Sequence, residues 1–127
     1  QIREQAALSL MLLVAETFRK TNKTITTNEV AVRLKIPGIL LGPVKKRLET
    51  AGLLEITSRG HLLPSRDPGQ ISLMEVFDAI RTANTADVYQ SGKWPAQVNQ
   101  VIDDLNAKVR DTLAPKSLYD LLDGKAG

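Results

Sequence analysis

The pattern of apolar and polar residues divides the chain into helical stripes separated by short polar breaks. Along 2–20, apolar residues such as Ala6, Leu10 and Leu13 recur at intervals of three or four, and their neighbours widen the stripe until it nearly encircles the segment. This predicts a central, buried helix. Its longest apolar run, 6–15, is broken only by Ser9 and has ten residues, about half of what a membrane-spanning helix needs.

Two shorter helices joined by a tight turn are predicted next. Thr26 and Glu29 have the spacing of a capping box, which predicts a helix from there to about Leu34. Pro37 suits the first position of a following helix, because its missing N–H would have no partner there. That helix ends near residue 51, and Gly52 stands where a left-handed C-cap belongs.

The rest of the chain carries fewer and shorter elements. Residues 21–26 are polar and are expected to form a loop. The same reasoning then predicts a strand over 53–57, a return strand over 61–63, a capped helix over 72–83, a polar linker over 84–93, a helix opened by Trp94-Pro95, and a last short turn of helix over 117–122.

This order of elements is that of a winged helix-turn-helix. The predicted fold class is mainly α, with a short two-stranded wing and additional C-terminal helices. Residues 1–83 form the winged helix-turn-helix core, and 84–127 supply a linker, a helix and a tail that pack on the core or on a partner.

Composition narrows the chemistry. The 127 residues suit a single domain, and the absence of cysteine removes disulfides, thiol catalysis, zinc–thiolate sites and iron–sulfur ligation. The net charge of +3 is unevenly spread. Residues 1–66 hold 11 Lys/Arg and 5 Asp/Glu, a balance of +6, whereas 67–127 hold 6 and 9, a balance of −3. The basic half either meets a polyanion or is simply a solvated surface.

The predicted second helix of the helix-turn-helix lacks base-reading side chains. Positions 38–43 are Gly, Ile, Leu, Leu, Gly and Pro, none of which donates or accepts a side-chain hydrogen bond. Pro43 either removes a helix hydrogen bond or marks the true first turn. The expectation is weak, non-specific DNA binding through phosphate contacts, unless the charges only solubilise the surface; the candidate phosphate ligands are Arg33, Lys35, Lys45, Lys46, Arg47, Arg59 and His61.

No catalytic, cofactor or metal site is predicted, so the chain is not expected to be an enzyme. His61 is the sole histidine, and no recurring partner for general base catalysis or metal binding accompanies it. Asp103 and Asp104 are adjacent on a predicted helix, so their side chains point about 100° apart and do not converge.

The helix after Trp94 carries a long apolar stripe, which continues through Ile102, Val109 and Leu113. The stripe either packs on the helices of 2–20 and 72–83 or forms a surface for self-association. The candidate self-association residues are Trp94, Val98, Val101 and Leu105.

The segments 60–68, Ile71-Ser72-Leu73 and 76–81 resemble two related families. One is the IscR-type transcription regulators, which sense redox state or nitrogen oxides through an iron–sulfur cluster. The other is the cytoplasmic C-terminal domain of the YihY membrane proteins, also called ribonuclease BN. The chain departs from the IscR pattern: it has no cysteine, the wing is reduced to Arg59-Gly60, and Ala6-Ala7-Leu8 stands where that family has a tyrosine.

The resemblance implies two functions. The first is a non-catalytic binding or regulatory domain, the soluble cytoplasmic part of a YihY-type inner-membrane protein; the YihY type tolerates all three departures, and a start at Gln1 fits such an excised piece. Its partner would be a second copy or a segment of the longer parent, and the name ribonuclease implies no activity here. The alternative is an IscR-type DNA-binding regulator without a cluster.

Overall fold

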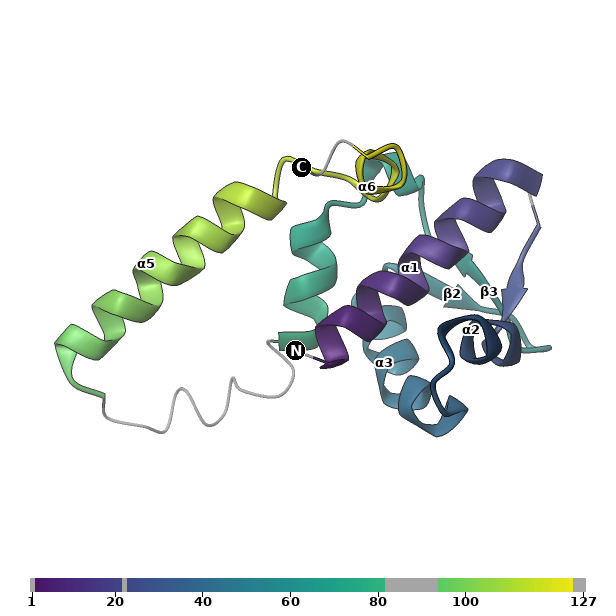
Figure 1. Cartoon of the computed structure of the whole chain (residues 1–127), viewed down its shortest axis with the longest axis horizontal. Helices are drawn as coiled ribbons and strands as arrows, with labels where there is room; N and C mark the ends of the chain where they lie inside the picture. The colour runs from purple at the N-terminus through teal and green to yellow at the C-terminus, as the bar shows by residue number, and fades with distance from the viewer. Residues whose placement is uncertain (1, 22, 82–93, 125–127) are drawn as a thin grey trace.

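The structure is a computed structural model that describes residues 2–21, 23–81 and 94–124. Its elements confirm the predicted mainly α winged helix-turn-helix (Figure 1). In order they are α1 (Ile2–Thr21), β1 (Ile25–Thr26), α2 (Thr27–Leu34), α3 (Gly38–Thr50), β2 (Leu54–Ile56), β3 (His61–Pro64), the 3-10 turn η1 (Pro68–Gln70), a helix over 73–81, α5 (Ala96–Leu113) and α6 (Leu118–Leu122). The predicted linker over 84–93 lies outside the described residues.

Capping boxes start three of the helices. At α2 the Glu29 amide donates to the Thr26 hydroxyl at 3.2 Å, and the Thr26 amide donates to the Glu29 carboxylate at 3.1 Å. Ser72 and Glu75 make the same reciprocal pair before the helix of 73–81, as predicted. A third box, Ser117 with Asp120, starts α6 and was not anticipated from the sequence.

The second of these boxes predicts an acid-sensitive contribution to stability. Partial burial raises the pKa of the Glu75 carboxyl, but hydrogen bonds from Arg66 and Ser72 outweigh burial and leave that pKa below its ordinary value. A depressed pKa stabilises the fold at pH values above the unfolded pKa of about 4.3, and this contribution disappears as the pH falls through the folded pKa. We expect Glu75→Gln to lower the free energy of unfolding, measured with urea, by about 0.5–1 kcal/mol at pH 7 and by almost nothing at pH 3.

The control for that measurement is Glu55→Gln on β2, where the glutamate is exposed. It removes the same charge without touching a capping box, so its effect at pH 7 is expected to lie within about 0.5 kcal/mol of zero. An equal loss in both variants would mean that net charge, not the capping box, sets the acid sensitivity.

The start of α3 differs from the prediction in one respect. Pro37 is the N-cap residue in extended conformation, not the first helical residue, and Gly38 begins the helix. Pro43 therefore lies inside α3 and removes the hydrogen bond that the Ile39 carbonyl would accept. Gly52 has a φ of 78°, which confirms the predicted left-handed position after α3.

The sheet has three strands rather than the two of the predicted wing. Its order is β1-β3-β2, with both pairs antiparallel. β1 pairs Ile25 with Leu62 and covers part of the segment expected to be a loop. A strand of two residues is too short for alternation to reveal it, so only its pairing with β3 identifies it.

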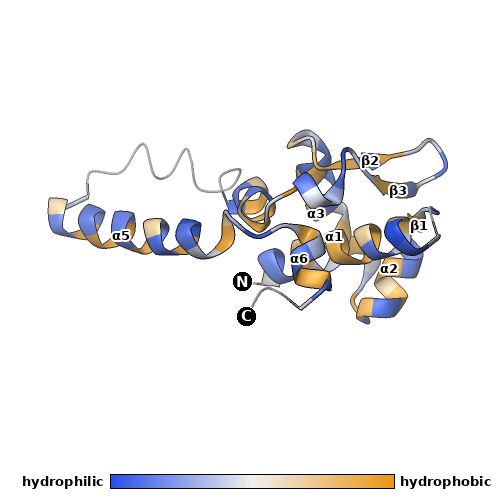
Figure 2. Ribbon diagram, turned by 90° about the horizontal axis from the view of Figure 1, so that it is seen from above, coloured by the Kyte–Doolittle hydropathy of each residue, from blue (hydrophilic) through white to orange (hydrophobic). Residues whose placement is uncertain are grey.

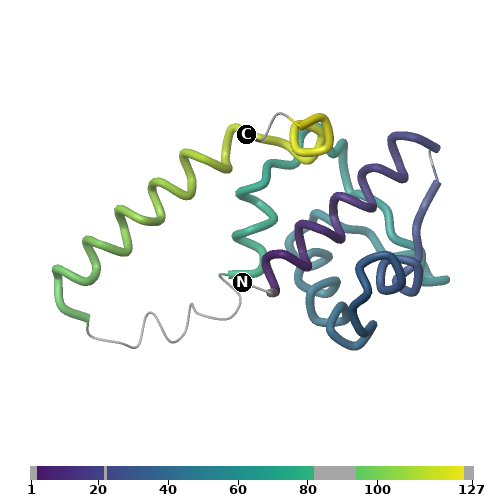
Figure 3. The backbone as a smooth tube through the Cα atoms, viewed as in Figure 1, coloured from purple at the N-terminus to yellow at the C-terminus, as the bar shows by residue number. Residues whose placement is uncertain are grey.

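The hydrophobic core gathers around α1, which contacts α3, α6 and β3. Ala7, Leu10, Met11, Val14 and Ala15 of α1 are buried, which fits the nearly continuous apolar stripe of this helix. Figure 3 traces the backbone back from α5 to α6, which lies beside α1. Outside the core, the Arg19 guanidinium lies 3.0 Å from the Asp123 carboxylate and stacks over Tyr119, 4.7 Å from the ring centroid.

Helix α5 extends away from this core, and none of its residues is buried (Figure 2). Its C-terminal half approaches the helix of 73–81, where Arg110 and Asp78 form an ion pair at 3.8 Å. In the part of the chain that the structure describes, no helix is both long and apolar enough to cross a bilayer.

Candidate nucleic-acid interface

Helices α2 and α3 are joined by a turn of residues 35–37. Lys35 closes α2 in the left-handed conformation, with φ at 57°, and its N–H donates to the Ala31 carbonyl. The Ile36 N–H donates to the same carbonyl at 3.2 Å. A non-glycine residue in this region is strained, and such strain is often found at functional sites. The turn places α3 in the position of a recognition helix.

Helix α3 has a buried and an exposed face. Leu41, Val44 and Leu48 are buried against the core. On the opposite face, Ile39 is 84% exposed, and Pro43 and Lys46 follow it at helical spacing and are also exposed. The exposed face is therefore apolar over its first turns and basic farther along.

Four of the seven candidate phosphate ligands are exposed. Arg33 is in the last turn of α2, Lys35 is in the turn, and Lys46 is on the outer face of α3. Arg59 is in the turn between β2 and β3, which the Gly60 amide closes by donating to the Thr57 carbonyl at 2.9 Å. Figures 1 and 2 both place this wing and α2 at the end of the molecule opposite α5.

The other three candidates are half-buried and bonded within the fold. The Lys45 ammonium donates to the Thr27 hydroxyl at 2.9 Å, and the Arg47 guanidinium donates to the Ile80 carbonyl at 3.2 Å. The His61 Nδ1 lies 2.8 Å from the Thr24 hydroxyl. These contacts join segments distant in sequence, so no local signal could have revealed them. Their role as phosphate ligands remains a prediction.

The Glu29 carboxylate lies in the first turn of α2, the turn in which the Lys45 ammonium bonds to Thr27. The Thr26 amide, and then its hydroxyl, donate to Glu29 and lower the pKa of its carboxyl. Glu29 is therefore ionised at neutral pH at the N-terminus of α2, where the helix dipole also favours a negative charge. Of the exposed candidates, Arg33 and Lys35 lie toward the other end of α2.

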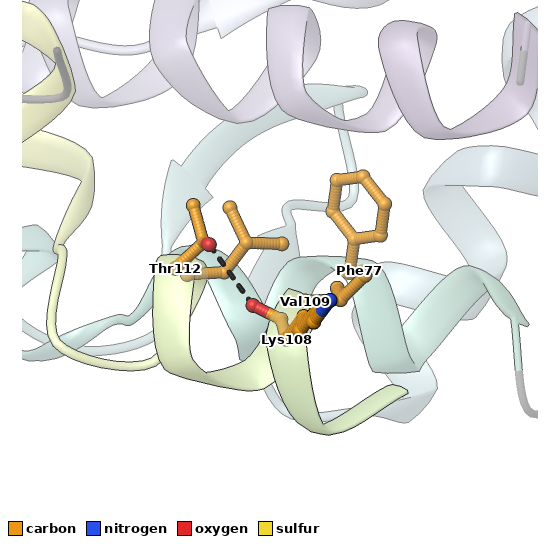
Figure 4. Close-up of a pocket in the computed structure, with 5 residues that line it drawn as sticks. Phe77, Lys108, Val109 and Thr112 are labelled. Carbon is orange, nitrogen blue, oxygen red and sulfur yellow. Dashed lines mark hydrogen bonds between the residues drawn. The ribbon is translucent and has the colours of Figure 1, made fainter. Parts of the chain in front are cut away.

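An apolar cleft of about 300 Å³ lies between the helix of 73–81 and α5. Phe77, Val109 and Leu113 line it together with Lys108 and Thr112. Figure 4 shows that the Thr112 hydroxyl is used within α5, where it donates to the Lys108 carbonyl at 2.9 Å. The cleft offers apolar contact rather than catalytic groups. Within the described residues, no cluster of three or more His, Cys, Asp or Glu is placed to hold a metal ion.

The comparisons with known proteins give structural neighbours only. No model of a known protein family matches the sequence, and no curated protein matches it. The oxidised form of CymR from Staphylococcus aureus superposes with a TM-score of 0.74 at 18% identity, covering 95% of this chain and 93% of that one. For IscR from T. potens the TM-score is 0.77 at 16% identity, with 98% and 86% covered.

CymR from B. subtilis, described as the global cysteine regulator, gives a TM-score of 0.72 at 16% identity, with 95% of this chain and 93% of that chain covered. At these identities the likeness shows the fold alone. It extends over nearly the whole length of both chains, so the helices after the wing are part of the shared architecture.

Proposed function

We propose that this chain is a non-catalytic, DNA-binding transcription regulator that acts as a homodimer. The observation that carries the proposal is the α2–turn–α3 unit, whose outer face is exposed and accompanied by Arg33, Lys35 and Lys46. The likeness to CymR and IscR supports the second function implied by the sequence. The comparisons give no support to a YihY-type membrane-protein domain.

Phosphate contacts supply the binding energy in this proposal. The exposed cations near the turn reach the DNA backbone and position α3 in the major groove, while Arg59 in the wing reaches a neighbouring phosphate. Such contacts release counterions, so the affinity falls steeply with salt. An iron–sulfur cluster, which IscR-type regulators use, does not fit this chain because it has no cysteine to ligate the iron.

The apolar stripe of α5 supports the homodimer. The expectation that Trp94 opens this helix is wrong, because α5 begins at Ala96 after the N-cap Pro95. Trp94, just before α5, and Val98, Val101 and Leu105 on α5 are 48%, 47%, 64% and 52% exposed. Four large apolar side chains in one exposed row are typical of an interface rather than of a monomer surface.

The spacing of the stripe is symmetric, which favours a second copy as the occupant. Trp94, Val98 and Ile102 are four residues apart, and Leu105, Val109 and Leu113 repeat that spacing after a step of three. These six positions, to which Val101 does not belong, are symmetrically spaced, so an isologous antiparallel pair of helices can align them. In that register Trp94 meets the partner's Leu113, beside the cleft that Phe77 lines.

The proposed function is tested by titrating the chain into a fluorescent duplex of mixed sequence and measuring anisotropy over a range of salt concentrations. We expect binding whose logarithmic affinity falls linearly with the logarithm of salt. Lys46→Gln is expected to weaken binding and to reduce the salt slope by about 1 per subunit.

The matched control is Lys108→Gln, which removes an exposed lysine on α5, a helix that lies at the end of the molecule opposite the wing. Its affinity and salt slope are expected to equal those of the unaltered chain. If no duplex binds even at low salt, the proposed function is wrong. If both lysine variants lose affinity equally, the interface lies elsewhere.

A further inference from the structure

The first turns of α3 expose apolar side chains where a recognition helix contacts bases. Outside the Trp94 stripe, the large apolar side chains that are exposed in the described residues are Val32, Ile39 and Leu40, at 76%, 84% and 53%. All three flank the turn between α2 and α3. Ile39, on the outer face of this helix, contributes little to the core. The residues around Ile39 therefore indicate which kind of ligand it contacts.

Two glycines of α3, Gly38 and Gly42, lie beside Ile39 although nothing within the fold requires glycine there. A Cβ added to Gly38 or Gly42 would meet no atom within 4 Å, and neither residue has a positive φ. A glycine inside a helix costs about 1 kcal/mol relative to alanine. Neither packing nor backbone conformation requires these glycines, but a ligand that approaches the helix backbone closely would.

Resting on the proposed function, we propose that Ile39 contacts the C5-methyl groups of thymines in the major groove, so that this chain prefers A·T-rich DNA. Residues near the start of a recognition helix face the base edges. The methyl group of thymine is the apolar feature that the major groove presents, and apolar side chains read it. Gly42 and Pro43 lie three and four residues after Ile39, on the same side of the helix, and their small surface lets the bases come close.

The charge around this apolar surface favours DNA over a protein partner. Arg33, Lys35 and Lys46 are exposed next to Val32, Ile39 and Leu40 in the sequence or on the helix face. Duplex DNA presents an apolar methyl group on the groove floor, with a row of phosphates on either side. Positions 38–43 provide no side-chain hydrogen bond to guanine, cytosine or adenine, so methyl contact is the direct readout left to them.

The test compares duplexes that differ only in the methyl group. Alternating A·T duplexes of about two helical turns with G·C clamps are titrated beside identical duplexes carrying uracil in place of thymine, with anisotropy as the readout. Losing one buried methyl contact weakens binding about fourfold, and a dimer that buries one per half-site loses about fifteenfold. We expect Ile39→Ala to bind both duplexes with equal affinity, close to that of the unaltered chain for uracil DNA.

Gly42→Ala provides a second test, whose expected result, higher stability with weaker binding, cannot arise from a folding defect. The added methyl is expected to raise the urea midpoint, because alanine is the better helix former, and to weaken binding to the thymine duplex at least threefold by blocking close approach. If the chain binds both duplexes equally, the thymine proposal is wrong and DNA binding itself stands. If it binds neither duplex nor one of mixed sequence, both proposals fall. Gly42→Ala with undiminished affinity also counts against the methyl contact.

Discussion

Leu105→Asp is expected to convert the protein from a dimer into a monomer. Leu105 is half-exposed near the centre of the α5 stripe. In an isologous pair each substitution occurs twice, so two carboxylates would be buried close together without partners. We expect the dissociation constant to rise at least about 100-fold, equivalent to about 2.8 kcal/mol.

Sedimentation equilibrium measures this directly. The unaltered chain should show about twice its 13.9 kDa mass, and Leu105→Asp should show the single mass. Ala107→Asp is the matched control, because it adds the same charge about 200° round the same helix at an exposed position. It should stay dimeric. A monomeric unaltered chain at high concentration would remove the dimer proposal, and a dimeric Leu105→Asp would move the interface off this stripe.

Leu118→Ala is expected to produce the largest loss of stability among these variants. Leu118 begins α6, is fully buried, and belongs to the same core as α1. Its N–H donates to the Ile71 carbonyl at 3.0 Å, and the Leu73 N–H donates to the Lys116 carbonyl at 2.8 Å, so the entry to α6 is bonded to the core on both sides. A buried Leu→Ala change costs about 2–5 kcal/mol, which is a large part of the free energy of unfolding of a typical domain, about 5–15 kcal/mol.

The comparison variant is Leu40→Ala on α3, the same chemical change at a side chain that is 53% exposed. Its cost is expected to stay below about 0.5 kcal/mol. Both are measured by urea unfolding at one protein concentration, because association stabilises the folded chain by mass action. Equal costs for the two variants would mean that α6 is not an integral part of the core.

Local sequence rules predicted the elements that local interactions form. The capping boxes at Thr26 and Ser72 each bring together residues three positions apart, so their spacing alone predicted two helix starts. Gly52 was predicted because a left-handed residue after a helix favours glycine. Pro37 shows the limit of such rules, because proline is favourable on either side of a helix start. The prediction made Pro37 the first helical residue, whereas Pro37 is the N-cap and the helix begins at Gly38.

The candidate interface was only partly accessible to the same reasoning. The apolar stretch at 38–43 is a local fact, so the absence of hydrogen-bonding side chains there was visible in the sequence. The partners of Lys45, Arg47 and His61 were not visible, because each bonds to a residue at least eighteen positions away. Which cations stay exposed is decided by packing between elements.

The sequence by itself determined the order of the helices, the turn between α2 and α3, the lack of cysteine chemistry and the apolar stripe of α5, because each depends on residues within a few turns of one another or on composition. The tertiary structure alone decided that β1 pairs with β3, that α6 packs against α1, and that Arg47 points to Ile80 rather than outward. It also decided that the N-terminal part of the α5 stripe is left exposed. These outcomes depend on contacts between distant segments, which local patterns do not encode.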